Sequence, residues 1–280
     1  MKHEEMKWKA RDGIELFAQV WEPSVVSPRA VVCLVHGLGE HSSRYAHVAE
    51  AFEKEGFILF GFDHRGHGRS GGIRGHVSSI EDFLQDIDLL LEQARKRYPN
   101  LPILLYGHSL GGILVLHYGL KRKPDIKGVI ATSPGLHTAL EKQPVKIFMA
   151  KLLGSLMPGT TLPSGLDAKA ISRDEAVVKK YQQDPLVHDK ISLGFGKNML
   201  GVTKWTLDHA GEFPLPLLLM HGKNDAIAYD TSSTEFAAAL KDNCTLVLWE
   251  GGYHEMHNEP EKAEVFKTMT MWMDARLRQE

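Results

Sequence analysis

The chain has 280 residues, of which 43% are hydrophobic and 24% charged, the composition of an ordinary globular protein with one large core. Its formal net charge of −2 creates no basic field, so we expect no nucleic-acid partner. Residues 1–11 lack the apolar core of a signal peptide, and no later stretch has the roughly 18 apolar residues of a membrane span. These features predict a soluble, cytoplasmic protein. Its two cysteines, Cys33 and Cys244, stand in or beside apolar runs, where cysteines commonly pack as small hydrophobic side chains.

Short apolar runs alternate with helical patterns along most of the chain. This alternation is typical of βαβ units and predicts an α/β fold with a mostly parallel central sheet and helices on both faces. A turn signal at residues 11–13 separates two alternating segments and predicts an antiparallel hairpin before these units. The strands are predicted at residues 6–10, 14–21, 30–35, 57–62, 102–106, 129–132, 216–220 and 245–249.

Helical spacing of apolar residues is clearest at residues 80–94, where one face must pack on the sheet. Strand signals stop between residues 135 and 213, a stretch with four prolines and several glycines among short helical patterns. We interpret residues 135–213 as a helical cap inserted into a core formed by residues 1–134 and 214–280, because the strand rhythm resumes near residue 216.

A Gly-x-Ser-x-Gly motif spans residues 107–111, directly after the strand predicted at 102–106 and before a helix-forming stretch at 113–120. This is the context of the nucleophile elbow of the α/β-hydrolase fold. Side chains at Gly107 and Gly111 would clash in so sharp a turn, and Ser109 at a helix N-terminus favours developing negative charge. Ser70, which no strand precedes, is interpreted as a turn residue. Ser109 is therefore the predicted nucleophile.

A catalytic serine needs a base, which a carboxylate must orient, and in this fold the chain order is serine, acid, histidine. Asp225 lies in a polar loop after the strand predicted at 216–220, and His254 follows the strand predicted at 245–249. We predict that these two residues complete a catalytic triad with Ser109.

Three nearby residues compete for these roles. Asp208 and Asp230 lie near the acid's loop, although Asp230 is also a candidate helix N-cap before residues 231–240. His257 follows His254 by three residues, one short of the spacing in a zinc-binding His-Glu-x-x-His helix, so we expect no metal site.

An oxyanion hole needs two backbone N–H donors, one from the residue after the nucleophile and one from an early strand-to-helix loop. Leu110 follows Ser109 directly. Leu38 lies between two glycines in residues 36–40, the loop after the strand predicted at 30–35. We predict that the N–H groups of Leu38 and Leu110 form the hole.

Several motifs together resemble those of monoacylglycerol lipases and related lysophospholipase-like hydrolases. They are His36-Gly-Leu-Gly-Glu-His-Ser-x-Arg-Tyr45, Asp63-His-Arg-Gly-His-Gly-x-Ser70, Gly107-His-Ser-Leu-Gly-Gly112, the Asp225 and His254 loops, and Tyr181-Gln-Gln-Asp-Pro-Leu186 in the insertion. The resemblance spans nearly the whole chain. The family often has Ala where Leu38 stands and Met where Leu110 stands. Both positions act through backbone N–H, so these differences are expected to reshape the acyl pocket only.

The resemblance implies an enzyme that needs no cofactor and hydrolyses monoacylglycerols to glycerol and free fatty acid, with an apolar acyl tunnel under the cap. It also implies four substrate-binding residues at the polar end of the site: Glu40, Arg44, Tyr181 and His257. Each also has a structural interpretation, such as an ion pair for Arg44 or cap packing for Tyr181. The same triad could serve a lysophospholipase, a short- or medium-chain carboxylesterase, or a serine peptidase or amidase.

An apolar face at helical spacing marks the start of the insertion. Its members are Val145, Phe148, Met149, Leu152, Leu153 and Leu156. This face could pack against the core or line the acyl pocket, chiefly through Phe148, Met149 and Leu152. It could also rest transiently on a membrane or micelle surface, as amphipathic helices do. The sequence leaves these three interpretations open.

Overall fold

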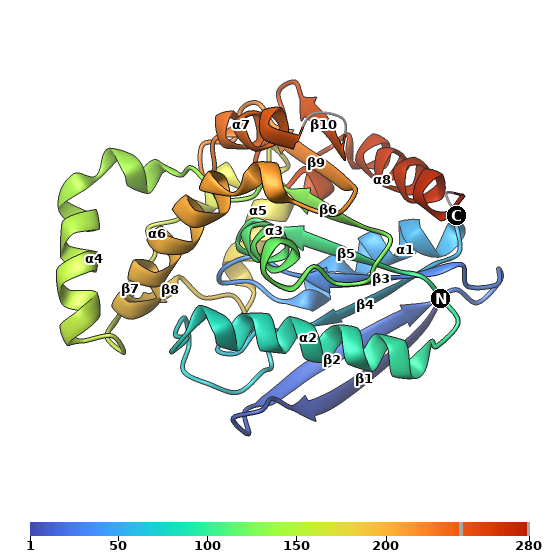
Figure 1. Cartoon of the computed structure of the whole chain (residues 1–280), viewed down its shortest axis with the longest axis horizontal. Helices are drawn as coiled ribbons and strands as arrows, with labels where there is room; N and C mark the ends of the chain where they lie inside the picture. Colours follow the sequence, from blue (N-terminus) through green and yellow to red (C-terminus); the bar gives the residue numbers. More distant parts are fainter. Residues whose placement is uncertain (241–242, 279–280) are drawn as a thin grey trace.

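The computed structural model describes residues 1–240 and 243–278, except for the side chains of Leu140, Lys142, Lys146 and Met149. Eight strands form the main sheet: β1 (Lys2–Lys9), β2 (Glu15–Glu22), β3 (Ala30–Val35), β4 (Phe57–Phe62), β5 (Ile103–His108), β6 (Gly128–Thr132), β9 (Leu217–Gly222) and β10 (Cys244–Trp249). Their spatial order is β1-β2-β4-β3-β5-β6-β9-β10 (Figure 1). The β1–β2 and β2–β4 pairs are antiparallel and all other pairs are parallel. The predicted mostly parallel sheet, opened by an antiparallel hairpin, is confirmed.

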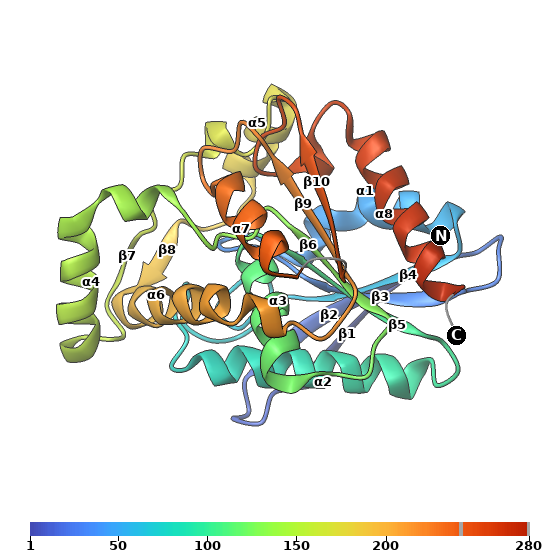
Figure 2. The same ribbon diagram turned by 45° about the horizontal axis from the view of Figure 1, so that its top comes forward.

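Helices cover both faces of this sheet (Figures 1 and 2). One layer holds α1 (Ala46–Lys54) and α8 (Lys262–Leu277), and the other holds α2 (Ile80–Arg97), α3 (Leu110–Arg122) and α7 (Asp230–Leu240). Alternate residues of β3 enter the two layers, with Val31 in one and Val32 in the other. A strand buried on both faces needs apolar residues throughout, which explains its unbroken apolar sequence.

Residues at its two ends explain where α2 begins and ends. The Ser79 side chain accepts the N–H of Glu81 while the Asp82 carboxylate accepts the N–H of Ser79, so the helix begins at Ile80. Basic side chains at Arg95, Lys96 and Arg97 face the negative end of the helix dipole in its last turn. The helix runs three residues beyond the predicted range of 80–94.

The segment between β6 and β9 contains α4 (Pro144–Leu156), α5 (Glu175–Gln183), α6 (Leu193–Asp208) and the short 3₁₀ helices η2 (Ala139–Lys142), η3 (Ala168–Ala170) and η4 (Ala210–Glu212). The prediction that this segment has no strands is wrong, because β7 (Thr161–Pro163) and β8 (Lys190–Ser192) pair antiparallel. Each has only three residues, too few to show a period of two. In Figure 1 this segment stands beside the sheet, with α4 farthest out.

α6 joins this segment to the core, since Phe195 and Val202 are buried in the same hydrophobic cluster as α2 and α3. Cys33 and Cys244 are both free thiols. Within residues 1–240 and 243–278, no helix combines the length and the apolar character needed to cross a bilayer.

Candidate active site

Ser109 lies in a strained turn between β5 and α3, with φ 54° and ψ −112°. Non-glycine residues rarely adopt positive φ, and functional sites are where such strain is tolerated. Both flanking glycines are sterically required. A Cβ on Gly111 would lie 1.9 Å from the Val35 carbonyl oxygen, and one on Gly107 would lie 2.2 Å from the Gly111 carbonyl oxygen. The turn therefore lifts the Ser109 hydroxyl above the carboxyl ends of the parallel strands.

A chain of hydrogen bonds joins Ser109, His254 and Asp225. His254 Nε2 lies 2.8 Å from Ser109 Oγ, and His254 Nδ1 lies 2.6 Å from Asp225 Oδ2. The three residues follow β5, β10 and β9 respectively, so the parallel sheet brings together loops that are far apart in sequence. A neutral imidazole that donates from Nδ1 to the carboxylate presents an acceptor at Nε2 to the hydroxyl.

The three competing residues lie outside this chain of bonds. Asp208 pairs with Lys204 at the exposed end of α6, and Asp230 is the first residue of α7 and not its N-cap. His257 is buried in the short helix η6 (Met256–Asn258).

Electrostatics favour an ionised acid and a basic imidazole in this pair. Burial alone would raise the pKa of Asp225, but attraction to His254 and hydrogen bonds from His221 and His254 hold that pKa well below its usual range. Burial alone would lower the pKa of His254, but the Asp225 carboxylate outweighs it and raises the pKa above 6.5. The side chains thus suit acceptance of a proton by His254.

The loop after β3 places a second set of groups beside Ser109. A Cβ on Gly37 would lie 3.4 Å from Ser109 Cβ, so the loop backbone packs directly against the nucleophile. His36 Nδ1 donates to the Gly37 carbonyl at 2.8 Å. In a trans peptide the N–H opposes the C=O, so this bond turns the Leu38 N–H away from His36. In the part of the chain that the structure describes, neither the Leu38 nor the Leu110 N–H donates to a protein acceptor.

A buried charge network stands beside the loop and the base. Arg44 donates to Glu40 at 2.6 Å and to both carboxylate oxygens of Glu255 at 2.7 Å. Glu40 also accepts the Gly37 N–H at 2.6 Å and the Tyr45 hydroxyl at 2.8 Å. Burial raises the pKa of Glu40, whereas burial of Glu255 is outweighed by its two bonds to Arg44, which lower its pKa. The network ties the loop after β3 to the residue that follows His254.

The chain is similar to known proteins over most of its length. The family model described as serine aminopeptidase, S33 (Hydrolase_4) matches residues 26–261. The monoacylglycerol lipase of Mycolicibacterium smegmatis is 36% identical over 95% of this chain and 95% of its own length. The crystal structure of Paleococcus ferrophilus monoacylglycerol lipase has a TM-score of 0.83 and 34% identity, covering 99% of this chain and 100% of that chain. The chain belongs to the monoacylglycerol lipase family of α/β-hydrolases.

Membership in this family makes the protein a carboxylic ester hydrolase with the α/β-hydrolase fold, as the sequence predicts. An uncharacterised abhydrolase domain-containing protein of Dictyostelium discoideum is 44% identical over 95% of this chain. This chain spans only 28% of that protein's length.

The residues implied by the family resemblance gather at the charge network. Arg44 lies over the Tyr181 ring of α5, with its guanidinium carbon 4.7 Å from the ring centroid. His257 stacks on Tyr45 at 4.8 Å between centroids, and neither of its ring nitrogens has a hydrogen-bond partner among the described residues. Glu40 and His257 are buried, only 9% of the Arg44 side chain is exposed, and Tyr181 is half-buried. All four therefore lie in one cluster beside His254.

Three contacts anchor the segment between β6 and β9 on the loops of the site. These backbone bonds run from Tyr229 N to His137 O (2.8 Å), from Glu255 N to Ile171 O (2.7 Å) and from His188 N to Gly39 O (2.9 Å). The first holds the loop of Asp225, the second the loop of His254 and the third the loop of Leu38. The segment thus contributes directly to the positions of all three loops.

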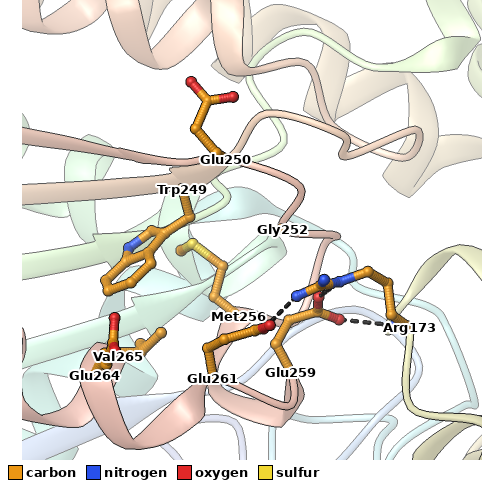
Figure 3. Close-up of a pocket in the computed structure, with 9 residues that line it drawn as sticks. All are labelled: Arg173, Trp249, Glu250, Gly252, Met256, Glu259, Glu261, Glu264 and Val265. Atoms are coloured by element: carbon orange, nitrogen blue, oxygen red, sulfur yellow. Dashed lines mark hydrogen bonds and ion pairs between the residues drawn. The ribbon is translucent and has the colours of Figure 1, made fainter.

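Side chains reinforce the contact between Ile171 and the His254 loop (Figure 3). Arg173 donates to Glu259 and Glu261 from its guanidinium group, and its own N–H donates to Glu259 at 2.8 Å. These residues line a small pocket with Trp249 and Met256. Residues that precede and follow His254 in the sequence line the pocket, but Ser109, Asp225 and His254 do not.

The apolar face predicted on α4 lies largely in solvent. Phe148 is 63% exposed and Leu152 is 48% exposed, while the side chain of Met149 lies outside the described residues. Val145 and Leu156 are also exposed. Two members of the predicted acyl-pocket wall therefore face water in this structure.

Sequence reasoning missed two residues that contact the triad or its neighbours. Glu255 directly follows His254 but matches no catalytic motif. His221 stands four residues before Asp225 at the end of β9 and also matches none. The only sequence signal for either was proximity to a predicted catalytic residue. Among the described residues, no three His, Cys, Asp or Glu side chains are grouped to hold a metal ion.

Proposed function

We propose that this protein hydrolyses monoacylglycerols to glycerol and free fatty acid through an acyl-enzyme at Ser109. The observation that carries the proposal is the chain Ser109 Oγ–His254 Nε2–His254 Nδ1–Asp225 Oδ2, with distances of 2.8 and 2.6 Å. The monoacylglycerol substrate is supported by the relatives from M. smegmatis and P. ferrophilus, which carry that activity in their names.

In the first half-reaction, Ser109 Oγ attacks the ester carbonyl while His254 Nε2 takes the hydroxyl proton. The carbonyl oxygen becomes an oxyanion that accepts hydrogen bonds from the N–H groups of Leu38 and Leu110. Each of these bonds contributes about 3 kcal/mol of transition-state stabilisation. His254 then gives its proton to the departing glycerol oxygen as the tetrahedral intermediate collapses. Water activated by His254 attacks the acyl-enzyme in the second half-reaction, releases the fatty acid and restores Ser109.

We propose that the polar cluster accommodates the glycerol end of the substrate. The partial exposure of Tyr181 and the stacking of Arg44 on its ring support direct contact of these two residues with glycerol. The burial of Glu40 and His257 supports a bracing role, in which they hold Arg44 and Tyr45 in place.

Residues 135–213 are proposed to act as a cap over the site. Its anchors on the Asp225, His254 and Leu38 loops support this role. The exposure of Phe148 and Leu152 on α4 favours contact with a membrane or micelle surface over a purely internal acyl wall, because apolar side chains gain free energy by leaving water.

The lipid-surface contact is tested by sedimentation with phosphatidylcholine vesicles. Phe148→Ser and Leu152→Ser are expected to weaken vesicle binding and activity on vesicle-borne substrate, with activity on a dissolved short-chain ester unchanged. Met271, which is 62% exposed on α8, supplies the matched control Met271→Ser. Equal vesicle binding by all variants would exclude α4 as the contact.

The nucleophile is tested by labelling with a fluorophosphonate probe. Ser109→Ala should abolish the label and all hydrolysis, whereas Ser70→Ala, in a buried turn, should retain both. A label that persists in Ser109→Ala would show that another residue is the nucleophile.

The substrate class is tested on a panel of monoacylglycerol, lysophosphatidylcholine, p-nitrophenyl esters of increasing chain length and aminoacyl amides. We expect the highest kcat/KM for monoacylglycerol. The family model's description makes an aminoacyl amide the necessary comparison. Faster cleavage of the lysophospholipid or the amide would show that this compound, and not monoacylglycerol, is the preferred substrate.

A further inference from the structure

His221 lies at the end of β9 with its side chain fully buried. Its Nε2 donates to the carbonyl oxygen of Ala228 at 3.1 Å and lies 3.2 Å from Oδ2 of Asp225. On the other side of the ring, Nδ1 is 2.7 Å from the hydroxyl of Ser233 on α7. The imidazole therefore connects a core helix to the carboxylate that holds His254.

These partners define which ring nitrogen carries the proton. The Ala228 carbonyl can only accept a hydrogen bond, so Nε2 must be the N–H of His221. Nδ1 lies 2.7 Å from the Ser233 hydroxyl, and this bond holds the ring in the orientation in which the Nε2–H faces both Ala228 and Asp225.

The same turn satisfies the other oxygen of Asp225. The N–H groups of Ile227 and Ala228 donate to Oδ1 at 2.8 and 3.0 Å. Oδ2 accepts from His254 Nδ1 at 2.6 Å and has the His221 N–H beside it. By binding the Ala228 carbonyl, His221 holds the turn whose N–H groups orient the carboxylate, and the orientation of Oδ2 depends on that turn.

We propose that His221 is a positioning residue for the hydrolytic reaction, whose imidazole, held by Ser233, keeps the Asp225 carboxylate aimed at His254. This role rests on the proposed function of Ser109, and His221 acts through Asp225 without touching substrate. It extends the chain of bonds inward from Ser109 to Ser233. The Nε2–H dipole of His221 already faces the buried Asp225 carboxylate, so it does not have to reorient when His254 becomes charged during the reaction.

The test compares His221→Leu, which removes both bonds, with His221→Gln, whose amide N–H can occupy the place of Nε2–H. Steady-state kinetics on a p-nitrophenyl ester and the rate of fluorophosphonate labelling are measured from pH 5 to 9. We expect His221→Leu to lower kcat and the labelling rate about 10- to 100-fold, the usual effect of losing a residue that orients an active-site ligand, with KM within about twofold. His221→Gln should retain most of the activity.

The pH profile separates positioning from simple packing. When Asp225 is no longer aimed at His254, the base loses the partner that raises its pKa, so the acid limb of kcat/KM in His221→Leu should move to lower pH. Ser233→Ala, which removes only the hydrogen bond at Nδ1, should fall between wild type and His221→Leu.

His117 supplies a matched control. It is also buried and its Nδ1 bonds a hydroxyl, that of Thr206 at 2.9 Å, but the contacts described for it include no triad residue. His117→Leu should keep the wild-type kcat and acid limb.

Two outcomes would overturn the proposal. One is a wild-type labelling rate in His221→Leu. The other is an equal loss in the Leu and Gln variants with an unmoved acid limb, which would leave His221 a packing residue. The probe reports Ser109 activation whatever the ester, so failure to cleave monoacylglycerol would refute the substrate proposal and leave this test intact.

Discussion

Replacing Arg44 with Met is expected to lower the free energy of unfolding strongly at pH 7 but only slightly at pH 5. The substitution removes three hydrogen bonds and leaves two buried carboxylates, Glu40 and Glu255, without their shared counter-ion. Breaking a buried ion pair from one side typically costs 3–5 kcal/mol, because the remaining charge cannot be solvated. The least costly response is for one of the two carboxylates to bind a proton.

The cost of that proton sets the magnitude. Each pKa unit corresponds to 1.36 kcal/mol, so protonating a carboxyl with an ordinary pKa of 4.5 costs about 3.4 kcal/mol at pH 7 and about 0.7 kcal/mol at pH 5. The folded variant binds more protons than its unfolded chain in this range, so its stability falls as pH rises. In wild type the lowered pKa of Glu255 contributes stability that is lost only as pH falls below 4.5. The raised pKa of Glu40 also makes wild type lose stability as pH rises, so the difference in free energy of unfolding between variant and wild type should shrink by at most about 2.7 kcal/mol from pH 7 to pH 5.

Thermal unfolding followed by circular dichroism measures this effect. At about 2–3 °C per kcal/mol for a chain of this length, the variant's Tm should lie about 7–10 °C below wild type at pH 7 and about 2 °C below at pH 5. Arg44→Met combined with Glu255→Gln removes the surplus charge and should recover much of the loss. A Tm deficit that is small at pH 7, or the same at both pH values, would refute the assignment of Arg44 as the counter-ion.

Two further predictions concern the base and the elbow. The raised pKa of His254 should place the acid limb of kcat/KM above pH 6.5, since the base must be neutral, and Asp225→Asn should move this limb to lower pH and reduce kcat by roughly 10⁴-fold. A limb that stays in place in Asp225→Asn would show that Asp225 does not set the basicity of His254. Gly111→Ala places a Cβ 1.9 Å from the Val35 carbonyl oxygen and should abolish soluble expression or activity. Gly201→Ala in α6, where the new Cβ meets nothing within 4 Å, should be neutral or stabilise by up to about 1 kcal/mol, and a well-folded, active Gly111→Ala would contradict the steric argument.

The centre of the sheet could be predicted from sequence because its strands are buried on both faces. Residues 30–35 and 57–62 are apolar from end to end, and the structure gives β3 and β4 the same bounds. The elbow and the chain order of the fold then predicted a triad of Ser109, Asp225 and His254, and the structure joins these three residues by hydrogen bonds. Each follows a parallel strand, and the carboxyl ends of such strands lie at one edge.

The missed features depend on contacts between segments far apart in sequence. The three-residue strands β7 and β8 form because the chain returns on itself, which no local pattern records. Glu255 is held by Arg44, which lies 211 residues earlier, and a buried carboxylate has no sequence signature apart from its partner. The apolar face of α4 was visible in the sequence, but whether it meets the core or solvent is decided by where the whole segment stands.

The backbone bonds that anchor the insertion link the strands predicted from local sequence to contacts between segments far apart in sequence. Each loop of the site is positioned at its base by a strand that the sequence reveals, and at its outer side by a backbone bond from residues 137, 171 or 188. A shift of the insertion would therefore act on the loops of Asp225, His254 and Leu38 together. The exposed side chains of Phe148 and Leu152 take no part in these bonds, so substituting them is expected to change the apolar surface of the insertion while the geometry at Ser109 is retained.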